Sequence, residues 1–150
     1  MDITWITGRL AVGGGIWTDA NMQQVVRAGI THIIDMQVEF DDTHLAEPYG
    51  VQVLWLPVDD DFRLKPAQIF ERAADFALRI LDQPDTKLFI HCAAGVHRGP
   101  IMALAVLRVL GFSPEDAITL IEERRPVVDF AEIYVRSVDN FMRSYAEAAE

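Results

Sequence analysis

The stretch TKLFIHCAAGVHRGP, residues 86–100, decides which kind of fold this chain can adopt. Residues 86–92 are almost all apolar, which is typical of a strand covered on both faces at the centre of an α/β sheet. Pro100 suits the first turn of a helix that follows. The loop of residues 93–99 therefore joins the carboxyl end of a central strand to the amino end of a helix, where open α/β sheets bind anions.

Strand and helix patterns alternate along the rest of the chain. Strands are expected over residues 3–7, 10–12, 31–36, 51–58 and 86–92. Helices are expected over residues 18–28, 66–81, 100–110, 113–125 and 130–147. Pro57 should end the 51–58 strand or place it at a sheet edge. The order predicts one α/β domain over residues 1–150: a central, mostly parallel sheet of about four to five strands, flanked by helices, with a phosphate-binding loop between a central strand and a helix.

Composition excludes several classes of protein. Apolar residues make up 51% and charged residues 24%, so a folded domain is expected rather than a disordered chain. Thirteen Lys and Arg against 23 Asp and Glu give a net charge of −10, which repels nucleic acid and anionic membrane surfaces. The single cysteine cannot form an internal disulfide, and no stretch suits a signal peptide or a membrane span. We therefore expect a cytoplasmic monomer without nucleic-acid or membrane partners.

The spacing of Cys92 and Arg98 predicts an anion cradle. Six residues of separation let the loop curl so that its backbone N–H groups point inward, while the guanidinium closes the ring as a two-pronged donor. The same groups favour the thiolate of Cys92, which is its nucleophilic form. Gly95 can take backbone angles that other residues resist. The residues predicted to bind substrate are Ala93, Ala94, Gly95, Val96, His97 and Gly99.

The motif His91-Cys92-x-x-Gly95-x-x-Arg98 resembles the signature of the cysteine-dependent protein tyrosine phosphatases. The whole chain is similar to their compact dual-specificity branch, because LAVGGG, GITHIIDM, LPVDDD and ERRP occur in the order of that branch. The resemblance implies hydrolysis of phosphotyrosine and of phosphoserine or phosphothreonine on proteins. It also implies a phosphorylated protein or a small phosphomonoester as the partner, and no cofactor or metal.

The resemblance further implies that Asp60 is the general acid, with Asp59 and Asp61 as neighbours that could substitute. Cys92 would attack the phosphorus, and Asp60 would then act as the base that activates water against the phosphocysteine. His91 is expected to support the site by hydrogen bonding to Cys92 or to the loop. His97 either adds positive charge for the substrate or faces solvent.

Two departures from the family pattern carry predictions. Family members usually have Ser or Thr directly after the arginine, and the hydroxyl stabilises the departing thiolate, whereas this chain has Gly99. Slow decay of the phosphoenzyme, with a burst and low turnover, is therefore predicted. The second departure is Asp129-Phe130 in place of a Pro-Asn pair, which removes an expected support of the loop. Arg125 could brace the loop instead.

Two other functions are compatible with parts of the pattern. A catalytically weak phosphate-binding module would explain Gly99, but such a module needs neither Cys92 nor Asp60. Sulfur transfer or arsenate reduction also uses a cysteine on an anion loop. Rhodanese-type loops differ in length, however, and arsenate reductases need further cysteines, which this chain lacks.

Overall fold

A five-stranded sheet forms the middle of the molecule, in the order β1-β2-β5-β3-β4. The computed structural model describes residues 1–149. The strands are β1 (Ile3–Trp5), β2 (Leu10–Gly13), β3 (His32–Gln37), β4 (Gln52–Val58) and β5 (Leu88–His91). β1 is antiparallel to β2, and the other neighbouring pairs are parallel. The predicted α/β class, mostly parallel sheet and central position of the strand before Cys92 are confirmed.

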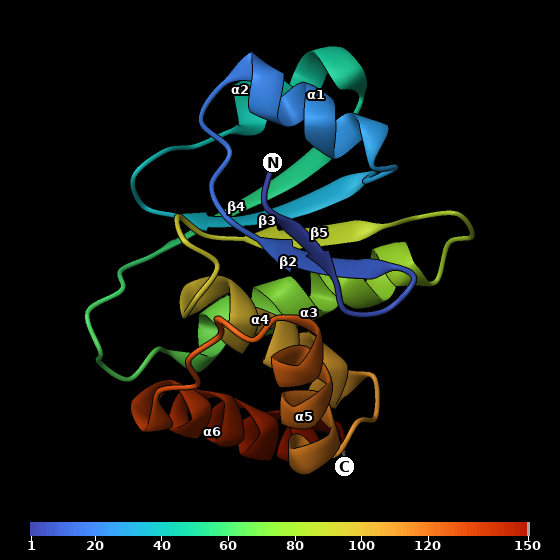
Figure 1. The fold of residues 1–150 in the computed structure, drawn as a ribbon. Coiled ribbons are helices and arrows are strands. Elements are labelled where there is room, and N and C mark those ends of the chain that lie inside the picture. The colour runs from blue at the N-terminus through green and yellow to red at the C-terminus, as the bar shows by residue number, and fades with distance from the viewer. Residues whose placement is uncertain (150) are drawn as a thin grey trace.

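Helices cover both faces of the sheet (Figure 1). α1 (Asp19–Arg27), α2 (Thr43–Ala46) and the short 3-10 helix η1 (Glu47–Tyr49) lie on one face. α3 (Ala67–Leu81), α4 (Arg98–Val109), α5 (Pro114–Arg124) and α6 (Glu132–Ala149) lie on the other. None of these helices is both long and apolar enough to cross a bilayer.

The two faces of β5 pack into different cores because side chains alternate along a strand. Phe89 lies in the core beneath α1, together with Ile33 of β3. Leu88 and Ile90 lie in the larger core formed with α3, α4, α5 and α6, and Cys92 continues that row. The alternation thus fixes on which side of the sheet each site residue emerges.

Local signals set most of the helix boundaries. Thr18 caps α1 in a capping box with Asn21, and the hydroxyl of Ser113 accepts the N–H of Asp116 at the start of α5. Pro66 is the N-cap of α3 rather than part of its first turn. Residues 43–49, for which no element was predicted, form α2 and η1. Their four and three residues are too short to show a helical period in sequence.

Because β2, β5, β3 and β4 are parallel, the segments that follow them all lie at the carboxyl end of the sheet, on the left in Figure 1. The connection between α5 and α6 reaches the same end. β4 is an edge strand, as Pro57 predicted. Each predicted site residue therefore lies at one end of the sheet, although the residues come from separate parts of the chain.

Candidate active site

The loop of residues 93–97 turns its carbonyl groups outward. Each of them accepts a hydrogen bond: two from the side chain of Arg125, one from the first turn of α4 and two from backbone N–H groups of other segments. The donors, in loop order, are the N–H of Gly15 (3.0 Å), Arg125 Nη2 (3.3 Å), Arg125 Nε (2.8 Å), the N–H of Asp129 (3.0 Å) and the N–H of Ile101 (3.1 Å). Because a trans peptide points its C=O and N–H in opposite directions, the N–H groups of residues 94–97 face the inside of the loop. The loop is thus shaped to bind an oxyanion.

Cys92 lies at the bottom of this loop. Only 2% of the residue is exposed, and the N–H of Gly95 donates to its Sγ over 3.2 Å. Gly95 takes a φ of +69°, in the left-handed region that other residues avoid. The sulfur therefore lies within hydrogen-bonding distance of a loop amide.

The guanidinium of Arg98 closes the loop and is held by the segment after β3. Its Nη1 and Nη2 donate to the two carboxylate oxygens of Glu39, over 2.7 and 3.0 Å, and Nη1 also donates to the carbonyl of Val58 over 2.9 Å. Nε is buried and has no partner within residues 1–149. The fork is therefore fixed in orientation while its Nε–H stays unpaired among these residues. The hydrogen bond to Arg98 holds the pKa of Glu39 below its ordinary value.

The segment after β4 places Asp60, rather than its neighbours, against the phosphate loop. One carboxylate oxygen of Asp60 accepts the phenol of Tyr134 (2.8 Å), and the other lies 3.1 Å from Nδ1 of His97. Asp61 instead pairs with Lys65 at 2.5 Å, and that hydrogen bond lowers the pKa of Asp61. Asp59 is exposed. Of the three adjacent acids, Asp60 is the one in position to serve the site.

His91 binds away from the sulfur, in a cluster of buried acids. Its Nε2 lies 2.9 Å from Oδ2 of Asp42 and 3.7 Å from Oδ1 of Asp35, and all three side chains are fully buried. Burial raises the pKa of Asp35 to about 7 and of Asp42 to about 6, and it lowers the pKa of His91 to about 4. The imidazole is therefore neutral near pH 7 and anchors the strand end just before Cys92.

The same three residues are types that can bind a metal ion. Within residues 1–149, one potential ligand atom from each of Asp35, Asp42 and His91 lies within 4.8 Å of the others. Oδ1 and Oδ2 of Asp35 already accept the N–H groups of Gln37 and Asp42. Hydrogen bonds between these buried, partly protonated groups are sufficient to explain why the three side chains lie together.

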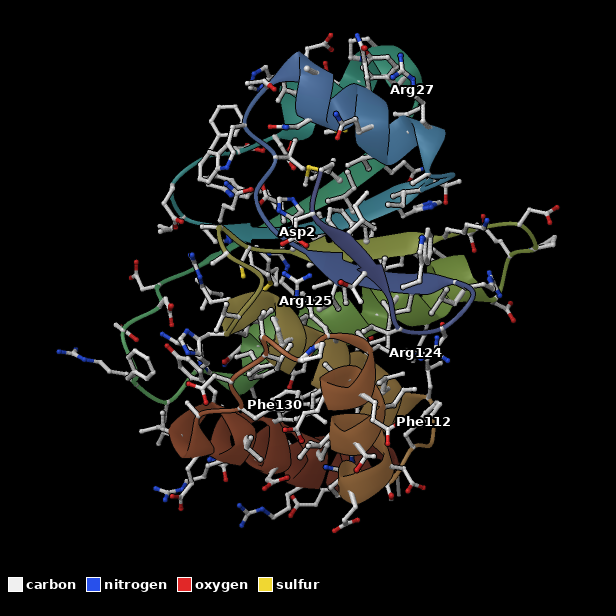
Figure 2. All side chains as sticks on the ribbon, viewed as in Figure 1. Asp2, Arg27, Phe112, Arg124, Arg125 and Phe130 are labelled. Atoms are coloured by element: carbon white, nitrogen blue, oxygen red, sulfur yellow. The ribbon has the colours of Figure 1, made fainter. Side chains whose placement is uncertain are left out.

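Arg125 braces the phosphate loop from the outside, as the sequence suggested it could. The residue is 5% exposed, and its guanidinium binds the carboxylate of Asp2 and the hydroxyl of Thr4 as well as the loop carbonyls. Figure 2 shows Asp2, at the start of the chain, facing Arg125, which follows α5. The hydrogen bond from Arg125 holds the pKa of Asp2 below its ordinary value. The amino-terminal segment is thereby tied to the site.

Asp129 supports the phosphate loop from a second side. The absence of the family's Pro-Asn pair had put support from this side in doubt. Its N–H donates to the carbonyl of Val96, and its Oδ2 lies 3.0 Å from Nε2 of His97. His97 is thus held between Asp60 and Asp129, with 18% of its side chain exposed. Neither expectation for His97, a charge for the substrate or a solvent-facing side chain, anticipated this bridging position.

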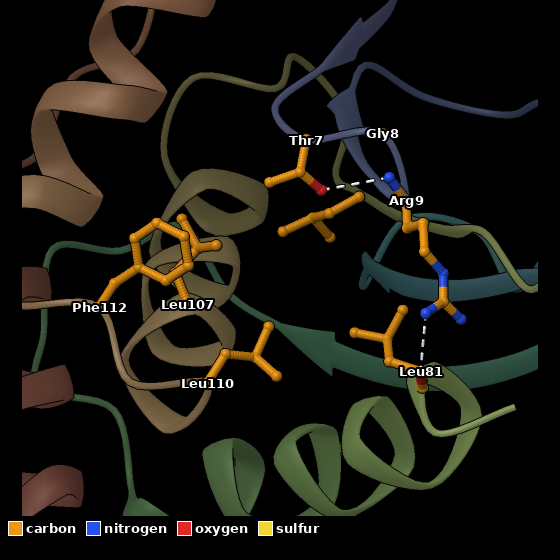
Figure 3. A pocket seen from close by; sticks show the side chains of 8 residues that line it. Thr7, Gly8, Arg9, Leu81, Leu107, Leu110 and Phe112 are labelled. Atoms are coloured by element: carbon orange, nitrogen blue, oxygen red, sulfur yellow. Dashed lines mark hydrogen bonds between the residues drawn. The ribbon is translucent and has the colours of Figure 1, made fainter. Parts of the chain in front are cut away.

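An apolar hollow lies elsewhere, away from the phosphate loop. Figure 3 shows it at the far end of α4, lined by Thr7, Gly8, Arg9, Leu10, Leu81, Leu107, Leu110 and Phe112. Its one charged side chain, Arg9, already donates to the carbonyls of Leu81, Gln83 and Thr86. The charge of Arg9 is thus turned to these carbonyls and the rest of the lining is mostly apolar, so the phosphate loop is the better candidate for the active site.

Sequence analysis missed four residues that hold the site together. They are Asp2, Glu39, Asp42 and Tyr134. Glu39 and Asp42 follow the β-branched strand that ends near Met36, so a search for polar side chains after each strand would have found them. Asp2 and Tyr134 carry no such signal, because their partners, Arg125 and Asp60, are far from them in the sequence.

Comparisons with known proteins agree with this geometry. Residues 15–144 match the family model for the dual specificity phosphatase catalytic domain. The chain is 32% identical over 111 residues to rat dual specificity protein phosphatase 26, an alignment that covers 72% of this chain and 53% of the rat protein. The human protein of that name is also 32% identical over 111 residues, covering 73% of this chain and 50% of the human one. The chain thus spans about half the length of the curated relatives it matches.

Solved structures share the fold. PTPMT1 in complex with PI(5)P matches with a TM-score of 0.85 and 20% identity over 99% of both chains. Human DUSP28 matches with a TM-score of 0.81 and 18% identity over 97% of this chain and 96% of the other. At these identities the likeness concerns the arrangement of helices and strands.

Proposed function

Because this chain belongs to the dual-specificity phosphatase family of cysteine-dependent protein tyrosine phosphatases, we propose that it hydrolyses phosphomonoesters through a phosphocysteine intermediate. The observation that carries the proposal is that every backbone carbonyl from residue 93 to residue 97 accepts a hydrogen bond from a group outside the loop. That arrangement leaves inward N–H groups above Cys92 and a free Nε on Arg98. Together they form a binding site for a tetrahedral oxyanion next to a nucleophile.

In the first step the thiolate of Cys92 attacks phosphorus in line with the leaving oxygen. The loop N–H groups and Arg98 stabilise the charge on the equatorial oxygens, so this chain's own residues supply the electrostatic stabilisation. Asp60 gives a proton to the leaving oxygen. In the second step Asp60 takes a proton from water, which attacks the phosphocysteine and releases phosphate.

The proposed substrates are phosphotyrosine and phosphoserine or phosphothreonine on proteins. The loop residues 93–97 include no lysine, which favours a group with one phosphate over a polyphosphorylated headgroup. One structural neighbour was solved with PI(5)P, a small phosphomonoester lipid, so small phosphomonoesters belong in the substrate panel.

A phosphate-binding module without catalysis is the alternative raised by Gly99. The position of Asp60 argues against it, because a pure binder gains nothing from a carboxylate held at both oxygens beside the phosphate loop. The alternative is therefore not favoured.

The proposal is tested by stopped-flow mixing of the protein with excess para-nitrophenyl phosphate, beside Cys92→Ser and Asp60→Asn variants. We expect a burst of nitrophenolate near one equivalent and a slow steady state, with no burst in Cys92→Ser. Trapping the phosphoenzyme and detecting the modified Cys92 by mass spectrometry would identify the intermediate. Release at the wild-type rate by Cys92→Ser would overturn the mechanism.

We further propose that residues 1–150 act as one catalytic domain, as a monomer in the cytoplasm. The single cysteine supports a reducing compartment. Light scattering after size-exclusion chromatography measures the oligomeric state, and fractionation of the source cell measures the location. A stable dimer or a secreted product would contradict these two predictions.

A further inference from the structure

The imidazole of His97 joins three segments that meet at the phosphate loop. Nδ1 lies 3.1 Å from Oδ2 of Asp60, which belongs to the segment after β4. Nε2 lies 3.0 Å from Oδ2 of Asp129, which belongs to the connection between α5 and α6. His97 itself precedes Arg98 in the loop. A single side chain thus connects the proposed general acid to the phosphate-binding loop.

Tyr134 of α6 holds the other side of the acid segment. Its hydroxyl donates to Oδ1 of Asp60 and accepts the N–H of Phe62, each over 2.8 Å. Phe62, with a φ of +55°, stacks on the Tyr134 ring at 5.5 Å and meets the His97 ring edge-on at 5.1 Å. Asp60 is therefore bound at both oxygens, and the segment is docked against the loop.

The hydrogen bonds among Tyr134, Asp60 and His97 restrict where protons can lie. Burial raises the pKa of Tyr134 to about 12, so the phenol keeps its proton and donates it to Asp60. The contact between His97 Nδ1 and Asp60 Oδ2 needs one proton between the two atoms. That proton can reside on the imidazole beside a carboxylate, or on the carboxyl group beside a neutral imidazole. Both forms carry the same net charge.

Building on the proposed function, we infer that Asp60 and His97 hold the catalytic proton in common, and that Asp129 positions His97 for this purpose. His97 is then a positioning residue that acts through Asp60. It keeps the acid segment docked against the phosphate loop and shares a proton with Asp60 across the contact between Nδ1 and Oδ2.

The surroundings of His97 favour the protonated pair. Burial alone would lower the pKa of His97, but hydrogen bonds to Asp129 and Asp60 outweigh burial, so its pKa lies above the ordinary value. The charged and titratable groups that face the ring are Asp60, Asp129 and Tyr134, since the Arg98 guanidinium is turned toward Glu39. A group with a raised folded pKa gives its full stabilisation below about pH 6.5, its unfolded value, and loses it as the pH rises through the folded pKa.

The shared proton moves to the leaving oxygen in the first step of the reaction and is replaced in the second. As the bond between Cys92 Sγ and phosphorus forms, the bond to the leaving oxygen breaks and that oxygen takes the electron pair. Asp60 passes it the shared proton, which leaves Asp60 ionised and His97 neutral with its remaining proton on Nε2 toward Asp129. Asp60 then removes a proton from the attacking water, and the pair is restored.

The test compares kcat/KM for two substrates as a function of pH in wild type and His97→Asn. This constant covers steps up to formation of the phosphocysteine, so slow decay at Gly99 does not mask the effect. Phenyl phosphate needs a proton on its leaving oxygen, whereas 2,4-dinitrophenyl phosphate does not. We expect His97→Asn to lower kcat/KM for phenyl phosphate by about tenfold or more, in the range of general acid catalysis, and to move its alkaline limb to lower pH.

With 2,4-dinitrophenyl phosphate the same variant should lose much less than with phenyl phosphate, because that leaving group needs no proton. His44→Asn, which replaces an exposed histidine of α2, is the matched control and should behave as wild type with both substrates. In the double variant Asp60→Asn/His97→Asn, the second substitution should add almost nothing with phenyl phosphate, since the two residues act as one unit. Equal losses with both substrates and an unchanged alkaline limb would overturn the inference.

An NMR titration of the His97 ring in the intact protein tests the pair without activity. Its pKa should fall in Asp60→Asn and in Asp129→Asn relative to wild type. If the protein has no activity above Cys92→Ser, the proposed function fails, but the titration still decides whether the pair exists. If the protein is active and neither substitution moves the titration, the pair is wrong while the proposed function stands.

Discussion

Gly99 follows Arg98 directly, in the first turn of α4 and close to the backbone of Cys92. A Cβ built there would lie 3.5 Å from the Cα of His91 and from the carbonyl of Ile90, which is ordinary van der Waals contact. The fold therefore has room for a Cβ at this position. The missing hydroxyl is a property of this residue alone and does not reflect crowding.

Gly99→Ser is expected to raise steady-state kcat and to reduce the burst, because its hydroxyl can donate to the thiolate that leaves in the second step. The measurement is stopped-flow release of nitrophenolate, with burst amplitude and slope read separately. Gly99→Ala is the control, since it fills the same space without a hydroxyl. Equal effects of the two substitutions would show that the hydroxyl is not the cause.

Gly95→Ala should open the phosphate loop. At a φ of +69°, a new Cβ would lie 2.7 Å from the carbonyl oxygen of Gly13 and against the guanidinium of Arg125. Left-handed strain costs about 1–3 kcal/mol, and the clash adds to it. We expect a lower melting temperature and vanadate binding weakened at least severalfold.

Gly111→Ala is the matched control for that variant. Gly111 also has a positive φ, of 105°, but a Cβ there meets nothing within 4 Å and lies far from the loop along α4. It should lower the melting temperature and leave vanadate binding intact. If Gly95→Ala bound vanadate as wild type does, the loop would not depend on this glycine.

At the scale of elements, Arg125 links β1, the phosphate loop and the end of α5. Its three nitrogens bind Asp2, Thr4 and the loop carbonyls from a buried position. Lysine keeps the charge but has no planar fork to reach several acceptors at once. The geometry of the loop thus depends on a contact between segments more than 100 residues apart in sequence.

Arg125→Lys is expected to destabilise the fold by roughly 1–3 kcal/mol, because carbonyls of the loop lose their donors. It should also weaken vanadate binding, measured by isothermal titration calorimetry. Arg124→Lys changes the exposed neighbouring arginine and should do neither. Loss of stability without loss of vanadate affinity would mean that the brace serves the fold and not the loop.

For the molecule as a whole, the buried cluster behind the active site sets a dependence of stability on pH. Burial raises the pKa of Asp35 to about 7, so the folded state holds a proton that the unfolded state releases near pH 3.8. Stability from this group therefore falls as the pH rises from about 4 to about 7. Burial lowers the pKa of His91 to about 4, which acts in the opposite direction below pH 6.5.

Asp35→Asn should separate these contributions, because it removes the carboxyl group that must ionise in the core. The melting temperature of the variant minus that of wild type should increase from pH 5 to about pH 7 and then level off, whatever its sign at pH 5. Thermal unfolding followed by circular dichroism measures it. A difference that stays constant over this range would show that Asp35 does not titrate there in the folded protein.

The expectations that succeeded concern residues close together in sequence. The strand over 86–92 and the helix after it follow from apolar runs, and Pro57 lies in an edge strand, which is one of the two outcomes predicted for it. Residues 43–49 were missed because their short helices are stabilised by packing on β4 and not by a periodic pattern. The identity of each element was readable, while contacts between elements were not.

The sequence by itself determined the phosphate loop, because Cys92, the small residues and Arg98 lie within one short connection whose shape follows from a strand end, a helix start and a left-handed Gly95. Only the tertiary structure decided which groups hold that loop. Glu39 on Arg98, Asp42 on His91, Asp2 on Arg125 and Asp60 with Asp129 on His97 are pairs joined across the fold. Local spacing fixes a turn of backbone, but which distant side chains meet depends on the strand order β1-β2-β5-β3-β4, which brings the ends of separate strands to one edge.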